Sequence, residues 1–296
     1  MNDRPANHDF KSLRCLKKTA TASPQLSVAV RVKNEAPMLP YFLNSLRQQL
    51  NINSVELVFL DSGSTDNTLE LILRGLPQAA LYSIHPSEFS FGATCNLMMH
   101  ITSAPYVAFF SGHVILRSPT TLLDAMSHIN TLGNISAFLR QVPSPTAGFN
   151  AYEQAFLSTA FPDMRSQTPI SFKRFSNAAS IVSREHWLKV PFPDVIASED
   201  GLWAMRAAKL GLPIHYFPKI LIEHSHNESP RQVRKRVQIN KLARFGTRKM
   251  PLRAAASFIK YMALLSLKGE HPVRAFEFSA AHAGAFIAPT ELSRNR

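Results

Sequence analysis

The chain has 296 residues, of which 45% are hydrophobic and 18% charged, and its formal net charge is +13. This composition excludes collagen-like, low-complexity and largely disordered proteins, and the length allows one large domain or two small ones. Two cysteines, Cys15 and Cys95, are too few for a disulfide framework and form no CxxC motif, so a reducing compartment is expected.

The first segment of the chain predicts a cytoplasmic protein. Residues 1–18 are polar and basic, without the apolar core of a secretory signal. Elsewhere no apolar run reaches the roughly 18 residues that a membrane-spanning helix needs.

Positive charge is concentrated at the two ends of the sequence. Residues 1–24 carry five Lys/Arg and two acidic residues, residues 25–226 carry 14 of each, and residues 227–296 carry 14 and four. A nucleic-acid-binding protein of uniform basic character would not divide in this way. The sequence therefore predicts a flexible basic arm at 1–24, a globular domain at 25–226 and a basic helical extension at 227–296.

Strand and helix patterns alternate over the first half of the globular domain. Dense β-branched runs predict buried strands, and apolar residues at helical spacing follow them. Short links between these elements indicate βαβ units and a mostly parallel sheet. A Pro-, Ser- and Thr-rich stretch at 140–175 is typical of a long loop or lid. We predict strands at 26–32, 55–61, 106–112, 176–183 and 214–226, and helices that begin at Pro37, Ser64 or Thr65, Ala93, Ser198 (as N-cap) and Ser229.

Three polar segments follow predicted parallel strands directly: 31–35, 61–68 and 111–113. Ligands of open α/β sheets bind beyond the carboxyl ends of the strands, so these segments are expected to share one site. In the second of them, Asp61 is placed to accept a hydrogen bond from a ligand, Ser62 lies beside it, and a helix N-terminus with free N–H groups follows. An ordinary helix-capping turn explains the same residues, and the pattern alone does not choose between the two.

Several motifs together resemble glycosyltransferase family 2, whose members have the GT-A fold. The motifs are VAVRVKNEAPMLPYFLNSL, VELVFLDSGSTDNTLELI, FSFGATCN, APYVAFFSGHVIL and the segment from FSNAAS to the Glu199–Asp200 pair. The next segment, EHSHNESPRQVRKR, is similar to bacterial members that transfer rhamnose and related sugars. The resemblance covers about Leu26 to Arg236. It implies a GT-A-type nucleotide-binding domain and an inverting transfer from a nucleotide-sugar, a UDP- or dTDP-sugar, to a glycan or lipid-linked glycan in bacterial surface polysaccharide synthesis.

The resemblance also implies roles for individual residues. Asp200 would act as the catalytic base that takes the proton of the acceptor hydroxyl, with Glu199 beside it. The remaining residues would bind the nucleotide-sugar: Arg31, Glu35, Asp61 and Ser62 at the nucleobase end, and Gly92, Asn96, Ser111 and Gly112 near the ribose and diphosphate. Acidic residues are also common in the first turn of any helix, where they complement its dipole.

The sequence departs from the family at its metal motif. The usual Asp-any-Asp motif is replaced by Ser111-Gly112-His113, which offers no carboxylate. Mg²⁺ prefers oxygen ligands, whereas imidazole suits Mn²⁺ and later transition ions. His113 is therefore a candidate ligand for a divalent cation, with His224 or His226 as the second. A direct contact between His113 and the diphosphate, or a site that has lost catalysis, explains the same departure.

The C-terminal extension mixes cations with apolar residues at helical spacing. Such a segment is typical of a helix that lies on an anionic membrane surface, and a peripheral position on the inner face of the plasma membrane is expected. A solvated helical face or an oligomer contact accounts for the same pattern. The alternative function for the whole chain is a catalytically degenerate GT-A-type protein that binds a nucleotide-sugar or serves as a scaffold.

Overall fold

The computed structural model describes residues 9–163 and 174–288. The chain divides into two compact units, which are described separately. The first, here called the sheet unit, comprises residues 1–142, 161–195 and 199–224. The second, called the helical unit, comprises residues 143–160, 196–198 and 225–296.

The sheet unit is built on a central sheet. Within the described residues this sheet has nine strands in the order β1-β4-β3-β2-β5-β8-β7-β9-β6. The strands are β1 (Arg14–Lys17), β2 (Leu26–Val32), β3 (Glu56–Asp61), β4 (Ala80–Ser83), β5 (Tyr106–Ser111), β6 (Ile115–Leu116), β7 (Ser136–Val142), β8 (Ala179–Ser183) and β9 (Ile214–Glu223).

The two halves of the sheet differ in direction. Strands β4, β3, β2 and β5 pair in parallel, as the alternating strand and helix patterns predict. Beyond β5 the sheet is mixed: β8 is antiparallel to both β5 and β7, β9 is parallel to β7, and β6 is antiparallel to β9. The α/β class with a central sheet is confirmed, and the parallel arrangement holds for the first half.

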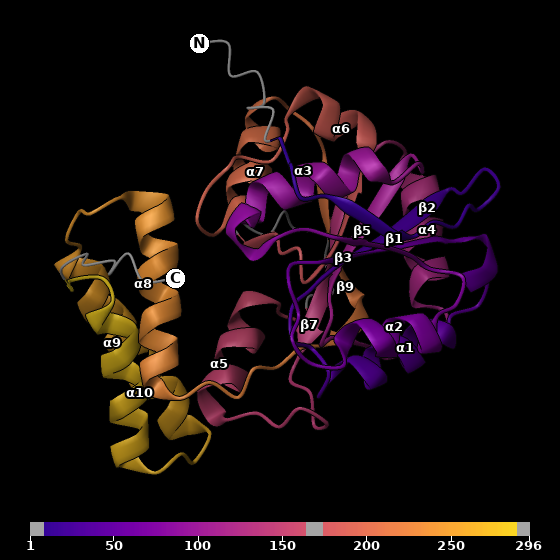
Figure 1. Cartoon of the computed structure of the whole chain (residues 1–296). Helices are drawn as coiled ribbons and strands as arrows, with labels where there is room; N and C mark the ends of the chain where they lie inside the picture. The colour runs from indigo at the N-terminus through magenta and orange to yellow at the C-terminus, as the bar shows by residue number, and fades with distance from the viewer. Residues whose placement is uncertain (1–8, 164–173, 289–296) are drawn as a thin grey trace. The chain divides into compact units, whose positions relative to one another are not determined.

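Helices cover the sheet. Figure 1 shows α3, α6 and α7 along one face and α1 and α2 on the other. Side chains of α1, α2 and α4 enter one core with β2, β3 and β5, including Phe42, Ile72 and Leu122. The helices of this unit are α1 (Leu39–Arg47), α2 (Thr68–Gly75), α3 (Phe91–Ile101), α4 (Thr121–Leu132), α6 (Arg184–Lys189) and α7 (Glu199–Lys209), with short 3-10 helices η1 (Ile52–Ser54) and η2 (Pro86–Glu88).

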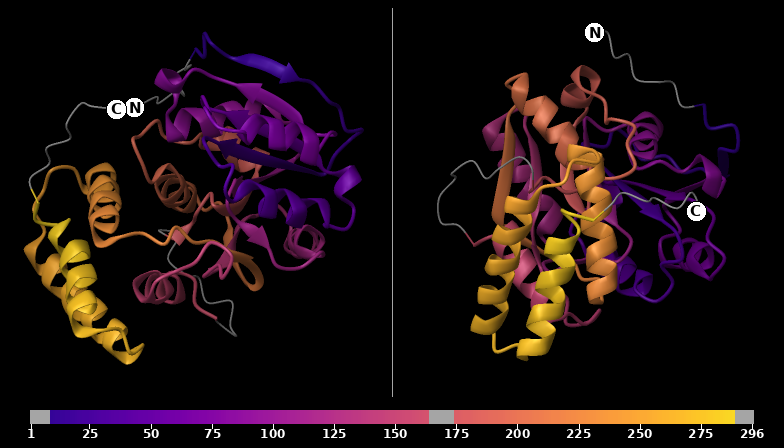
Figure 2. Two further views of the ribbon diagram at one scale, coloured as in Figure 1. Left: turned by 60° about the horizontal axis from the view of Figure 1, so that its bottom comes forward. Right: turned by 90° about the vertical axis from the view of Figure 1, so that its left-hand side faces the viewer.

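The helical unit contains α5 (Ala151–Ala160), α8 (Pro230–Phe245), α9 (Pro251–Leu267) and α10 (Pro272–Gly284). Helices α9 and α10 run side by side, as Figure 2 shows. Its core is aromatic, with Tyr152 stacked on Phe278 and Val233 and Val237 of α8 in the same cluster. Among the described helices, none combines the length and the apolar character needed to cross a bilayer.

Some local predictions were wrong, and long-range contacts explain why. Residues 14–17 of the supposed arm form the edge strand β1, which pairs with β4, whereas residues 1–8 lie outside the described residues. The predicted loop at 140–175 contains helix α5, and its residues 164–173 lie outside the described residues. Residues 143–160 fold with the C-terminal helices, a grouping that differs from the predicted division at 226/227.

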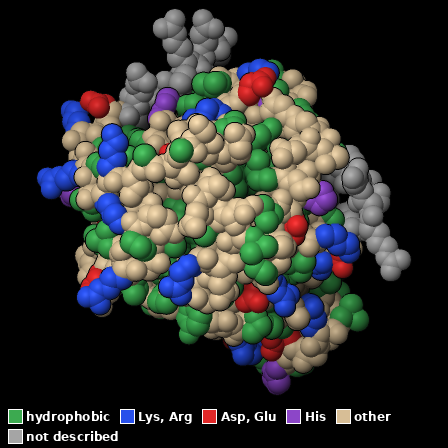
Figure 3. Space-filling view, turned by 90° about the vertical axis from the view of Figure 1, so that its right-hand side faces the viewer, with side chains coloured by type: hydrophobic (Ala, Val, Ile, Leu, Met, Phe, Trp, Pro, Cys, Tyr) green, Lys and Arg blue, Asp and Glu red, His purple; other side chains and the backbone are tan. Residues whose placement is uncertain are grey.

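On the face shown in Figure 3, Lys and Arg side chains are scattered among apolar and other groups, with Asp and Glu side chains beside some of them.

Candidate functional site

The carboxyl ends of β2, β3 and β5 lie together. Strand β2 lies between β3 and β5 and is parallel to both, with Val32 opposite Asp61 and Arg31 opposite Ser111. The three polar segments at 31–35, 61–68 and 111–113 therefore share one edge of the sheet, as the sequence predicts. This edge is where an open α/β sheet binds its ligands.

Two of these segments are joined by reciprocal hydrogen bonds. The side chain of Asn34 accepts from the N–H of Thr65 at 2.8 Å, while the N–H of Asn34 donates to the hydroxyl of Ser64 at 2.9 Å. The N–H of Glu35 donates to the hydroxyl of Thr68 at 2.9 Å. Because Ser64 and Thr65 are used in this way, neither caps a helix, and α2 begins only at Thr68, after Asn67.

Asp61 is buried, and its side chain stabilises the turn that directly follows it. Its carboxylate accepts from the N–H groups of Gly63 at 2.9 Å and Ser64 at 3.1 Å. Gly63 has φ +88°, a conformation that favours glycine. The Ser62 N–H donates to the carbonyl of Val32 at 3.1 Å. Both residues thus shape the turn, and their contact with a nucleobase stays a prediction.

Arg31 and Glu199 form an ion pair in which Glu199 is buried and Arg31 is partly buried. Their nearest charged atoms are 3.3 Å apart, and the side chains are 18% and 6% exposed. The same guanidinium donates to the carbonyl of Phe91 at 2.7 Å and to the hydroxyl of Thr94 at 3.1 Å. Burial lowers the pKa of Arg31, but the carboxylates of Glu199 and Asp200 outweigh burial and hold the pKa above its ordinary value. Glu199 is therefore held by Arg31 within the protein.

Asp200 is held differently from Glu199. Its carboxylate accepts from the N–H of its neighbour Gly201 at 2.6 Å and from the N–H of Asn177 at 3.1 Å, and the residue is only partly buried. The Asn177 side chain donates to the thiol of Cys95 at 3.3 Å. Burial raises the pKa of that thiol, which keeps it protonated. Of the two adjacent acids, Asp200 is the one partly open to solvent.

The imidazole ring of His113 contacts the carboxylate of Glu35. Its Nδ1 is 3.1 Å from both carboxylate oxygens of Glu35. Gly112 permits this approach, because a Cβ on it would lie 3.1 Å from Cγ of Glu35 and from Cγ1 of Val32. Glu35, predicted to line a nucleotide pocket, thus supports the imidazole. The N–H of Ser111, where β5 ends, donates to the carbonyl of Ala178 at 3.3 Å.

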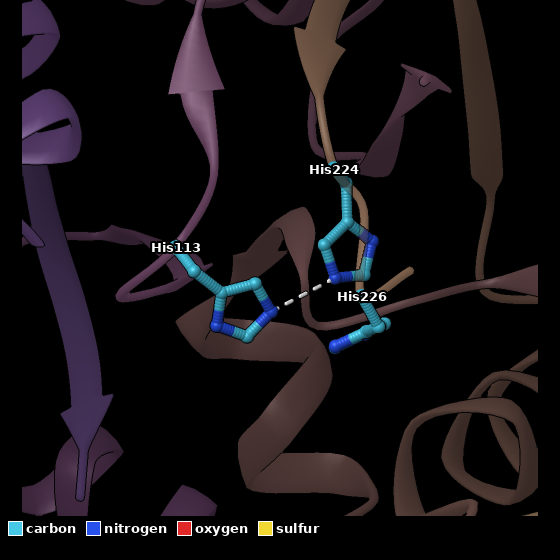
Figure 4. Close-up of side chains that lie close together, drawn as sticks. All are labelled: His113, His224 and His226. Carbon is cyan, nitrogen blue, oxygen red and sulfur yellow. Dashed lines mark hydrogen bonds between the residues drawn. The ribbon is translucent and has the colours of Figure 1, made fainter. Parts of the chain in front are cut away.

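His224 meets His113 because β6 pairs with β9. Ile115 and Glu223 are partners in that antiparallel ladder, which brings the residues before β6 next to the residue after β9. The two Nε2 atoms are 3.1 Å apart, and Figure 4 shows them facing each other. On the far side of the ring, Nδ1 of His224 is 2.8 Å from Oε1 of Gln141. His226, also drawn in Figure 4, belongs to the helical unit.

The donor set of this pair suits a divalent cation. When the two Nδ1 atoms carry the protons that Glu35 and Gln141 accept, both Nε2 atoms offer a lone pair to a cation. Two imidazole nitrogens that bind one ion at about 2.1 Å each lie about 3 to 3.5 Å apart, and 3.1 Å separate these.

Gly92 and Asn96 hold the segment 187–193. The side-chain oxygen of Asn96 accepts from the indole N–H of Trp187 and from the N–H of Phe192, both at 2.9 Å. A Cβ on Gly92 would lie 1.8 Å from the carbonyl oxygen of Pro193, so only glycine fits. These are structural roles, and the contact of Gly92 and Asn96 with ribose and diphosphate stays a prediction.

Gln141 and Asn177 are site residues that the sequence reasoning missed. Each acts through a strand pairing between distant segments, β7 with β9 for Gln141 and β5 with β8 for Asn177. No strand was predicted around Gln141, which lies in the stretch at 140–175 expected to be a loop, so no local signal pointed to it. Asn177 stands within the quoted FSNAAS motif without a role assigned to it.

Known proteins share both the sequence pattern and the fold. The family described as Glycosyl transferase family 2 matches residues 27–185. The O-antigen chain rhamnosyltransferase RfbN of Salmonella typhimurium is 24% identical over 219 residues, 70% of this chain and 68% of RfbN. WbaN of Salmonella anatum, also named an O-antigen chain rhamnosyltransferase, is 27% identical over 207 residues, 64% of this chain and 62% of WbaN.

Two solved structures illustrate the likeness in fold. One is the mannosyltransferase PcManGT from Pyrobaculum calidifontis in complex with GDP-Man and Mn²⁺, with a TM-score of 0.56, 18% identity, and coverage of 90% of this chain and 73% of that one. The other is S. aureus TarS 1-349 in complex with UDP-GlcNAc, with a TM-score of 0.57, 16% identity, and coverage of 88% and 90%. The matching residues include the three strand ends described above, and the chain belongs to glycosyltransferase family 2.

Proposed function

We propose that this glycosyltransferase inverts the configuration at the anomeric carbon of the sugar that it transfers, and that Asp200 acts as the general base. The observation that carries the proposal is the division of labour between adjacent acids: Arg31 neutralises Glu199, while Asp200 stays partly exposed. In the reaction Asp200 takes the proton of the acceptor hydroxyl, and that oxygen bonds to the anomeric carbon. The bond to the diphosphate breaks, and its electron pair leaves with the diphosphate oxygen.

The proposed donor is a nucleotide-diphosphate sugar and the acceptor a glycan or lipid-linked glycan of a bacterial surface polysaccharide. RfbN and WbaN are both named O-antigen chain rhamnosyltransferases, so rhamnose is the first sugar to test. PcManGT was solved with GDP-Man and TarS with UDP-GlcNAc. The nucleotides to compare are therefore GDP and UDP, together with the dTDP that the sequence resemblance implies.

His113 and His224 would hold the divalent cation in this proposal. A bound cation would supply positive charge to the departing diphosphate. Mn²⁺ is favoured over Mg²⁺ because both donors are imidazoles.

The test is an Asp200→Asn variant assayed for sugar transfer from dTDP-rhamnose and from UDP-sugars. Loss of a general base is expected to lower turnover by about 10² to 10⁴-fold while nucleotide affinity is kept. Asp124→Asn, at an exposed acid of α4, is the matched control and should behave as the wild type. Unchanged turnover in Asp200→Asn would refute the assignment. Wild-type protein that binds nucleotide but transfers no sugar would favour the non-catalytic alternative.

We further propose that the helical unit rests on an anionic membrane surface. Leu252, Ile259 and Leu267 of α9 are 87%, 68% and 85% exposed. Their spacing of seven and eight residues places them on one side of the helix. Lys260, Lys268 and Arg274 lie near this stripe in sequence, and each cation near an anionic surface contributes about 1 kcal/mol. Apolar groups bordered by cations suit the headgroup region of a bilayer.

Sedimentation with vesicles tests the membrane proposal. Wild-type protein should bind vesicles that contain phosphatidylglycerol, and this binding should be lost at high salt. It should not bind neutral vesicles. A Leu252→Glu/Ile259→Glu variant should bind at least tenfold more weakly. Leu188→Glu is the matched control, since Leu188 of the sheet unit is 66% exposed. If the double variant instead dissociates a dimer and vesicle binding is unchanged, the stripe contacts a second copy of the chain.

A further inference from the structure

Lys241 is a buried cation whose charge no described group offsets. The residue is 2% exposed, and among the described residues no hydrogen-bond acceptor lies within reach of its Nζ. Arg236, on the same helix, shows the contrast, because its guanidinium pairs with Glu228 at 2.7 Å. An ammonium removed from water without a partner costs free energy, so its presence calls for a ligand of opposite charge.

The position of Lys241 on α8 explains its burial. It follows Val237 by four residues and Val233 by eight, a spacing that keeps the three side chains on one side of the helix. Val233 and Val237 pack in the apolar core of the helical unit with Tyr152 and Phe278. An apolar side chain would suit this position better than a lysine, so packing does not account for the ammonium.

The residue next to Lys241 is tied to the segment that leads into α7. Asn240 is hydrogen-bonded to the hydroxyl of Ser198, with 3.0 Å between their oxygens. Ser198 has φ +61°, an unfavourable conformation for serine, and it directly precedes Glu199.

We propose that Lys241 binds a phosphate or diphosphate group of a substrate, an inference that rests on the proposed glycosyl transfer. Both substrates of that reaction supply the chemistry: the donor carries a nucleoside diphosphate, and a lipid-linked acceptor carries a lipid diphosphate. Diphosphate oxygens are strong acceptors for an ammonium, and the pairing is strongest where water is excluded. Lysine serves here as a point charge, without the fork geometry of arginine.

The experiment compares Lys241→Met with Lys235→Met in the full-length protein. Methionine keeps the length and apolar stem of the lysine and removes its charge, and Lys235 is an exposed lysine of the same helix. Calorimetry measures the binding of inorganic pyrophosphate first, and then of UDP, GDP, dTDP and farnesyl diphosphate. Thermal unfolding of the ligand-free variants is recorded in parallel.

Lys241→Met should bind pyrophosphate at least tenfold more weakly, while Lys235→Met stays near the wild type. Because the variant no longer buries an unpaired charge, its ligand-free Tm should rise. Loss of nucleotide binding would assign the group to the donor, and loss of farnesyl diphosphate binding alone would assign it to the acceptor. Unchanged binding of all probes, or a Tm that falls, would overturn the proposal, since a falling Tm indicates a structural partner for the ammonium.

The proposed reaction and the role of Lys241 fail in different ways. Asp200→Asn removes turnover without removing a phosphate contact, so it should bind pyrophosphate like the wild type. A wild-type protein without transferase activity, whose pyrophosphate binding still depends on Lys241, would refute the reaction and keep the anion site.

Discussion

Two pairs of polar side chains in the sheet unit are built in opposite ways. Arg31 and Glu199 carry opposite charges and complete each other at 3.3 Å. His113 and His224 are like groups with their Nε2 atoms only 3.1 Å apart. The first pair joins two groups of opposite charge, whereas the second brings together two nitrogen atoms of the kind that bind metal ions.

We expect this difference to separate residues that hold the fold from residues that bind a cation. A buried pair of opposite charges has little to offer a ligand, because its groups are already used. Two imidazole nitrogens this close together are suited to share one cation. The comparison predicts that substitutions in the first pair affect stability, and substitutions in the second affect binding.

The largest effect on stability is expected from Arg31→Met. The variant leaves the Glu199 carboxylate buried without its partner, which should cost about 3–5 kcal/mol of unfolding free energy. Urea denaturation measures it, with Arg206→Met at an exposed position of α7 as the control. A loss below about 1 kcal/mol, the range of exposed ion pairs, would contradict the view of this pair as a buried structural contact.

The next effect is expected from His113→Ala and His224→Ala. Each variant removes one of two imidazole ligands, so affinity for Mn²⁺ or Co²⁺ should fall by more than 100-fold while the Tm changes little. Calorimetric titration with each ion measures this, and EDTA should abolish metal-dependent nucleotide binding in the wild type. His128→Ala, at an exposed histidine of α4, is the control. If both variants kept the metal affinity of the wild type, the proposal that the cation binds at this site would be refuted.

A smaller effect is expected from Gln141→Leu. The Gln141 oxygen lies 2.8 Å from Nδ1 of His224, and its Nε2 is buried with no hydrogen-bond partner among the described residues. Loss of the oxygen should release the imidazole and weaken cation binding by about 10- to 100-fold. Gln141→Glu keeps an acceptor and should retain affinity, which sharpens the test. Equal affinities for the two variants would show that His224 needs no orienting group.

The smallest effect is expected from Ser229→Ala, which provides a scale for an ordinary satisfied contact. Ser229 caps α8 in a capping box with Gln232, and its loss should cost about 1 kcal/mol. Thermal unfolding measures the change, and cation affinity should not move. Should metal binding fall in this variant, the separation between structural and binding contacts would be lost.

The first half of the sheet could be predicted from sequence because its signals are local. Apolar β-branched runs, each followed by a helical pattern, specify β2, β3 and β5 and bring their polar ends together. His113 and His224 were recognised as candidate ligands by residue type and position at strand ends.

The rest depends on contacts between distant segments. Strand β6 has only two residues and no sequence pattern of its own, yet its pairing with β9 brings the two histidines together. The predicted N-cap Ser198 instead hydrogen-bonds Asn240, 42 positions along the chain. Glu35 was assigned to a nucleotide pocket, because nothing local indicates that it lies against His113.

The reciprocal hydrogen bonds between the loops at 33–36 and 61–68 have a consequence for engineering. Asn34 and Glu35 form hydrogen bonds with Ser64, Thr65 and Thr68, so each loop fixes the conformation of the other. Grafting one loop from a relative with a different loop sequence would leave backbone N–H groups of both loops without their acceptors. An exchange of either loop with that of a relative therefore has to transfer the two loops together, as a single unit.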